Sequence, residues 1–217
     1  MVNIGELEIL AVENSLISKK EEIFARELKR VAKVELKKSR ARENLMERIL
    51  ESSNIKKKMA EKNYEIIDHK IKKKDILQIP DVVLKNGKDY ANYNERVARL
   101  QNDIAKIHKR IADVETEIAD DRIKLANRKI ELAQERKELS KSQFSYIKKV
   151  KKSIPKDKIS KAQDLYLNKQ KEVEHARNRV MKKINDIKKK ENNLASLKGQ
   201  LSSTLNDVEK IKHKDIL

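Results

Sequence analysis

The most regular hydrophobic pattern lies between Tyr93 and Tyr146. From Val97 onward every seventh residue is apolar: Val97, Ile104, Ile111, Ile118, Leu125, Leu132, Leu139 and Tyr146. A column of alanines runs beside it: Ala98, Ala105, Ala112, Ala119, Ala126 and Ala133. A strict seven-residue period keeps one side of an α-helix facing a partner in a left-handed supercoil. The pattern therefore predicts a helix over residues 90–152, and its alanines would let a partner helix come close.

Two further stretches repeat this period and predict helices over residues 5–74 and 157–212. The column of the first is Leu10, Ile17, Phe24, Val31, Leu45, Met59 and Ile66, with Lys38 and Ser52 in its two gaps. Neighbours such as Ala11, Ala25 and Ala32 widen the stripe. The column of the second is Ile159, Tyr166, Val173, Val180, Ile187, Leu194, Leu201 and Val208. Within the first helix, Ser52-Ser53-Asn54 predicts a kink or a local break, because these side chains compete for backbone hydrogen bonds.

Turn signals separate the three helices. Pro80 and Asn86-Gly87 place residues 75–89 in a connector, since proline disfavours helix before it and Asn-Gly favours a turn. We expect the second helix to begin after Asp89 as its N-cap. Residues 153–156 form the second connection, a corner for which a tight reversal is preferred over a kink. There Ser153 is the expected N-cap of the third helix, and Asp157 complements its dipole.

Three helices of similar length predict an all-α fold. We expect three long antiparallel helices (up-down-up) with heptad seams, forming one elongated coiled-coil bundle over residues 1–217. Such narrow apolar stripes favour a dimer that buries the remaining apolar faces. The predicted seam comprises Val97, Ile104, Ile111, Ile118, Leu125, Leu132, Leu139, Val173, Val180, Ile187, Leu194 and Leu201.

Composition supports long helices and narrows the choice of compartment. Of 217 residues, 41% are charged and 3% aromatic, with three glycines, two prolines and neither cysteine nor tryptophan. The absence of cysteine excludes disulfides and cysteine-ligated metal sites. No apolar run is long enough to span a bilayer, and the N-terminal residues lack the pattern of a signal peptide. We therefore expect a cytoplasmic protein, or one peripheral to a membrane.

The formal net charge of +18 points to an anionic partner. The densest basic cluster lies at the predicted corner: Lys148, Lys149, Lys151, Lys152, Lys156, Lys158 and Lys161. An anionic membrane, the backbone of nucleic acid or an acidic protein surface could each use it. Because lysine far outnumbers arginine and aromatic residues are few, sequence-specific recognition of nucleic acid is not expected. The alternative is a solvated surface, since 35 acids are interleaved with the bases.

Catalytic patterns are nearly absent from the sequence. The four histidines, His69, His108, His175 and His213, are far apart and form no HExxH motif. Three glycines cannot build a phosphate-binding loop, and the carboxylates stand at helical spacing from bases, as in surface ion pairs. We therefore expect no enzyme activity, cofactor, metal or small-molecule substrate.

Two resemblances concern architecture alone. Three helices of near-equal length with a basic tip resemble BAR domains, which bend anionic membranes as dimers; the amphipathic N-terminal helix of many BAR domains is missing. The character of Arg96 to Lys152 is similar to the basic coiled-coil stalk subunits of type III export machines, which usually have two helices.

The sequence thus favours a non-enzymatic scaffold or adaptor that binds protein partners through helix–helix contacts, including a role as a subunit of a larger assembly such as a secretion apparatus. A homo-oligomer is part of this expectation. The alternatives are a BAR-like protein on anionic lipid and a coiled coil that binds nucleic acid non-specifically.

Overall fold

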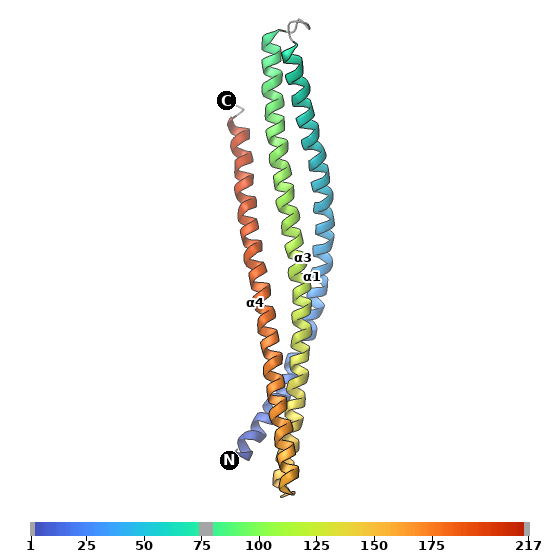
Figure 1. Ribbon diagram of the computed structural model, residues 1–217, viewed down its shortest axis with the longest axis vertical. Coiled ribbons are helices and arrows are strands. Elements are labelled where there is room, and N and C mark those ends of the chain that lie inside the picture. The colour runs from blue at the N-terminus through green and yellow to red at the C-terminus, as the bar shows by residue number, and fades with distance from the viewer. Residues whose placement is uncertain (1–2, 74–79, 215–217) are drawn as a thin grey trace. The chain divides into compact units, whose positions relative to one another are not determined.

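A computed structural model describes residues 3–73 and 80–214 of the chain. It contains three long helices: α1 (Ile4–Lys72), α3 (Asp81–Lys151) and α4 (Lys156–Lys214) (Figure 1). No strand occurs in these described ranges. The prediction of an all-α protein with three long helices is confirmed.

Helix α1 begins at a side-chain cap and continues without a break. The Asn3 Oδ1 atom accepts a hydrogen bond from the Gly5 amide at 3.0 Å, as expected for an N-cap asparagine. The predicted break at Ser52–Asn54 is absent, because all three residues are helical. Ser53 is buried on the side of α1 that carries its small residues, so it takes part in packing rather than in a turn.

Helix α3 begins at Asp81, earlier than predicted. Its first turn follows Pro80 directly, whose carbonyl accepts a hydrogen bond from the Val83 amide at 3.1 Å. Proline suits a helix start because the first amides of a helix have no intrahelical acceptor. Asn86 and Gly87 are helical, so the connector predicted over residues 75–89 is wrong from Asp81 onward. Residues 74–79 lie outside the described residues.

Ser153 ends α3 instead of capping α4, which corrects the prediction for this residue. Its φ of 46° is left-handed, a conformation usually taken by glycine at this position. The Ser153 amide donates to the Val150 carbonyl at 3.0 Å, and the Ile154 amide donates to the Lys149 carbonyl at 3.3 Å. This pair of bonds is a Schellman motif, which satisfies the last carbonyls of α3 and turns the chain into Pro155 and α4.

The contacts divide the chain into two compact units. The first unit contains residues 1–37 and 117–191, and the second contains residues 38–116 and 192–217. Each unit therefore includes part of every helix. The organisation of the chain as a single domain stays a prediction.

In the first unit, α1 packs on α3 through small side chains. Ala119, Ala126 and Ala133 of the alanine column predicted for α3 are buried in this unit, and so are Ala11, Ser18, Ala25 and Ala32 of α1. The Ser140 hydroxyl donates to the Ala11 carbonyl at 2.8 Å, a contact that large side chains would prevent. Small residues let two helix axes approach to the short end of the normal 8–10 Å range.

Polar pairs beside these small residues fix the register. Within the first unit they are Asn14–Gln143 at 3.2 Å, Glu21–Arg136 at 3.3 Å and Glu35–Arg122 at 2.8 Å. Each step forward on α1 by seven or fourteen residues is matched by an equal step back on α3. Within the second unit, Arg42 of α1 pairs with Glu115 of α3 at 2.7 Å.

The column predicted as the main packing stripe of α1 is exposed, which corrects that assignment. Phe24 is 62% exposed. The other exposed members are Leu10, Ile17 and Val31 in the first unit and Leu45, Met59 and Ile66 in the second. The adjacent small residues face α3 instead. We call these seven residues the open column of α1.

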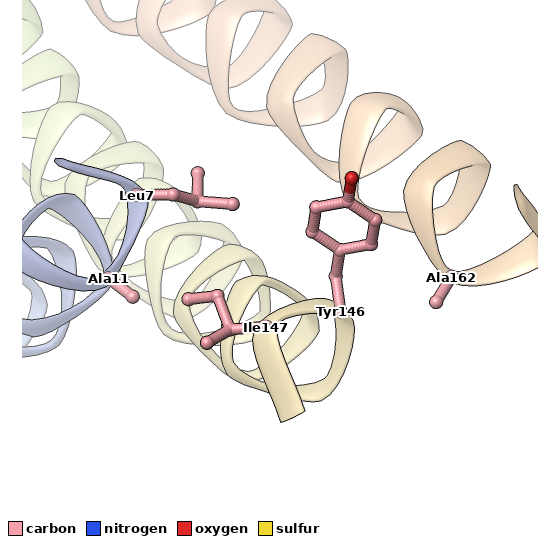
Figure 2. Packing of buried hydrophobic residues seen from close by; sticks show 5 residues of the cluster. All are labelled: Leu7, Ala11, Tyr146, Ile147 and Ala162. Carbon is pink, nitrogen blue, oxygen red and sulfur yellow. The ribbon is translucent and has the colours of Figure 1, made fainter. Parts of the chain in front are cut away.

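The first unit also contains a hydrophobic cluster where all three helices meet. Figure 2 shows Leu7 and Ala11 of α1 near Ile147, and the ring of Tyr146 between Leu7 and the ribbon that carries Ala162 of α4. The Tyr146 ring also stacks on Tyr166 of α4, with 5.8 Å between the ring centroids. This cluster anchors the beginning of α1 beside the turn between α3 and α4.

Candidate functional site

The predicted seam residues are all buried or half-buried. Those that are buried are Ile111, Ile118, Leu132, Leu139, Val180 and Ile187, and those that are half-buried are Val97, Ile104, Leu125, Val173, Leu194 and Leu201. Leu132 and Val180 share one cluster with Ala176, against which Leu125 and Val173 also pack. The residues of this cluster join α3 to α4 within the chain. Their role in selecting another protein stays a prediction.

A buried carboxylate accompanies the apolar contacts between α3 and α4. The side chain of Asp121 is only 7% exposed, and Lys183 and Lys190 of α4 approach it at 3.3 Å and 3.0 Å. Lys190 also pairs with Glu117 at 2.9 Å. Burial by itself would raise the pKa of Asp121, but hydrogen bonds from Lys190 and Lys183 outweigh it, so the pKa lies below its ordinary value.

The sequence predicts that the carboxylates form surface ion pairs with bases at helical spacing, which would include the adjacent Asp120 and Asp121. Only Asp120 fits that description, because it pairs with neighbouring Lys124 on the same helix at 2.6 Å and remains well exposed. Asp121 has Lys124 of its own helix at 3.8 Å, but its two nearer partners, Lys183 and Lys190, lie 62 and 69 positions away in the sequence and could not be read from local spacing. Lys183 and Lys190 therefore serve packing between helices and are not free for an anionic partner.

An apolar groove lies beside the open column in the first unit. It has a volume of about 390 Å³ and includes Phe24 of α1, Leu132 of α3, and Val180, Met181 and Ile184 of α4. Its charged lining consists of Lys129, Arg136, Arg177 and Glu21. We call it the first-unit groove. Sequence reasoning missed it, because the predicted packing stripe of α1 had been placed inside the bundle.

The second unit contains a comparable groove of about 420 Å³ between α1 and α3. Met59 and Ile66 of the open column line it, together with Tyr90 and Ala91 of α3. In each unit, then, an apolar groove borders members of the same column. A concave site that combines apolar side chains with polar groups is the usual form of a site that binds a ligand, and the apolar walls of these grooves can accept apolar side chains.

The seven lysines predicted to contact a polyanion surround the turn between α3 and α4 in the first unit. We call them the basic corner. Lys148, Lys151, Lys152, Lys156, Lys158 and Lys161 are exposed, and Lys149 is half-buried. Within the described part of the chain, only Lys151 among the seven has a carboxylate within 4 Å, that of Glu8 at 2.7 Å. The structure thus places these lysines together.

Two kinds of feature, a metal-binding group and a membrane-spanning helix, are not found in the described residues. No group of three or more histidine, aspartate or glutamate side chains is arranged there to hold a metal ion. None of the described helices has a segment apolar and long enough to traverse a bilayer.

Comparisons with known proteins identify no family. No protein-family model matches this sequence, and no curated protein is similar to it. The function must therefore be inferred from the surfaces described above.

The buried aspartate gives a test of the contact between α3 and α4. Its lowered pKa means that ionised Asp121 stabilises the fold above the ordinary aspartate pKa, and that this stabilisation is lost as the pH falls through the lowered value. Asp121→Asn should therefore reduce the free energy of unfolding at pH 7 by about 1–3 kcal/mol. The wild type and the variant should converge in strong acid. Urea unfolding followed by circular dichroism measures both effects.

Asp120→Asn is the matched control, because it removes one carboxylate from the neighbouring, more exposed position. Its effect should stay below about 1 kcal/mol. Equal losses for the two variants at pH 7 would show that Asp121 is not the buried partner of Lys183 and Lys190.

Proposed function

We propose that this protein is a non-enzymatic scaffold whose helices form an antiparallel coiled coil and which binds a partner helix along α1. The observation that carries the proposal is the open column. Large apolar residues recur there at seven-residue spacing, interrupted at Lys38 and Ser52, yet they are exposed. The small residues beside them are buried at Ala11, Ser18, Ala25, Ala32 and Ser53. The folded chain by itself leaves this column exposed, so we infer that a partner covers it.

The energetics support a partner rather than a solvated surface. Fully burying a large apolar side chain contributes about 1.5–3 kcal/mol, so each half-exposed member retains about 1 kcal/mol that a partner can gain. Scattered exposed apolar residues are normal on proteins, but a contiguous patch marks an interaction surface. The seven-residue period further specifies the partner as a helix with apolar residues at the same interval.

A labelled synthetic amphipathic helix tests this proposal. The peptide carries leucine at every seventh position with glutamate beside it, and its binding to the full chain is measured by fluorescence anisotropy. Ile17→Glu should weaken binding about tenfold or more, because the new carboxylate would be buried without a partner. Leu165→Glu is the matched control, since Leu165 is an exposed residue of α4 that does not line the first-unit groove. The proposal fails if the wild-type chain neither binds the peptide nor self-associates.

Contact with an anionic membrane surface is a second candidate function, supported by the charges at the start of α4. Positive side chains are unfavourable at a helix N-terminus, where the helix dipole is itself positive. Lys156 and Lys158 nevertheless stand there, with Asp157 as the acid of the first turn. The stability of α4 therefore does not explain Lys156 and Lys158. By contrast, Lys148, Lys149 and Lys151 complement the dipole at the C-terminus of α3.

Co-sedimentation with vesicles tests this second candidate. The wild type should pellet with vesicles that contain phosphatidylserine and not with neutral vesicles. Reversing Lys152, Lys156 and Lys158 to glutamate should lower partitioning at least about a hundredfold, since each lysine near an anionic surface contributes about 1 kcal/mol. The same reversal at exposed Lys182, Lys188 and Lys189 of α4 is the control for total charge. Equal losses in both triple variants would remove any special role for the basic corner.

A further inference from the structure

The first-unit groove has apolar walls on two different helices. Phe24 of α1 forms one wall, and Met181 and Ile184 of α4 form the other. All three side chains are exposed, while Leu132 and Val180 of the lining are buried. A helix placed between the walls would therefore cover apolar surface on both sides.

The charges of this groove restrict what can occupy it. The groove lining contains three bases, Lys129, Arg136 and Arg177, and a single acid, Glu21. Glu21 pairs with Arg136 at 3.3 Å. The ammonium group of Lys129 lies 5.2 Å from the centroid of the Phe24 ring. Within the described ranges, neither Lys129 nor Arg177 has a carboxylate within 4 Å. The occupant should therefore present acids beside its apolar residues.

One face of this chain has both properties. In the first unit the open column of α1 supplies Leu10, Ile17, Phe24 and Val31 at the required spacing. Exposed Glu6, Glu13 and Glu27 stand three or four residues from members of this column, which places them on the same side of the helix. Glu27 already pairs with Arg30 at 2.7 Å, so Glu6 and Glu13 are the acids that this face offers a partner. Lys20 is the one base in that series of positions. The face is therefore apolar and, on balance, acidic.

We propose that the first-unit groove is occupied by α1 of a second copy of this chain. The inference deepens the proposed function, on which it rests, by naming the partner helix. In a two-fold dimer the same patch serves both copies. Helix α1 is then both a wall of its own groove and the occupant of the partner's groove.

Further exposed apolar residues of α1 extend the surface that such an interface can use. A specific dimer buries roughly 800 Å² on each partner. Besides the open column, α1 exposes Ile9, Leu16 and Ile23, also at seven-residue spacing, and Ile23 is 71% exposed. A helix that lies between two walls contacts them through more than one column of its side chains. Ile9, Leu16 and Ile23 therefore belong to the same proposed interface.

Sedimentation velocity of the full chain over a wide range of concentration tests the inference. The wild type should be a dimer, and Phe24→Glu should weaken dimerisation at least about a hundredfold, because both copies lose the contact. Leu165→Glu, at an exposed position of α4 outside the groove lining, should dimerise like the wild type. Circular dichroism confirms that the variants keep their helix content.

Two results would overturn the inference: a wild type that stays monomeric at every concentration, or a Phe24→Glu variant that dimerises as tightly as the wild type. The synthetic acidic helix separates this failure from failure of the proposed function. If the chain is monomeric but binds the peptide at the open column, the proposed function of helix binding stands. A second copy of the chain is then excluded as the occupant of the groove.

Discussion

The close packing of α1 on α3 is the constraint on which the remaining surfaces depend. Both helices contribute small side chains to this contact, and the hydrogen bond from Ser140 to the Ala11 carbonyl shows how near the two backbones come. Two columns of leucine or phenylalanine could not occupy the same space. The large residues of α1 are therefore turned away from α3, which creates the open column.

The contact between α3 and α4 follows a different principle. Large aliphatic residues fill it, and Asp121 supplies a buried charge between Lys183 and Lys190. These two lysines differ in role from those of the basic corner, although both sets lie in lysine-rich stretches of the sequence. Burying one carboxylate fixes the position of α4 on α3, because leaving it unpaired would be costly. The net charge of the chain thus divides between lysines that hold the fold and lysines that face solvent.

Periodicity alone predicted much of this fold. The columns from Val97 to Leu139 and from Val173 to Leu201 are buried or half-buried, as their seven-residue period predicts. On α1 the period could not decide between two neighbouring columns, and the one with larger residues was preferred. The alanines of α3 were the missing signal, since they require small residues on the facing helix.

Other features were not predictable from local sequence. The burial of Asp121 depends on lysines of another helix, so its exposure could not be judged from its neighbours. Asn86-Gly87 is a turn signal in isolation, yet helix continues through it once Pro80 has started α3. Ser153 adopts a left-handed conformation that the sequence does not require, and the hydrogen bonds that end α3 account for it. The first-unit groove became visible only when the exposed side of α1 was known.

The measurement that tests the central claim most directly is disulfide formation between α1 and α3, which is feasible because the chain has no cysteine of its own. In a chain with Ala11→Cys and Ser140→Cys, mild oxidation should form an intramolecular disulfide, since the serine side chain contacts the Ala11 backbone at 2.8 Å. Leu10→Cys with Ser140→Cys should not, because residue 10 belongs to the open column. Rapid cross-linking of the first pair alone supports packing through small residues. Equal or faster cross-linking of the second pair would contradict it.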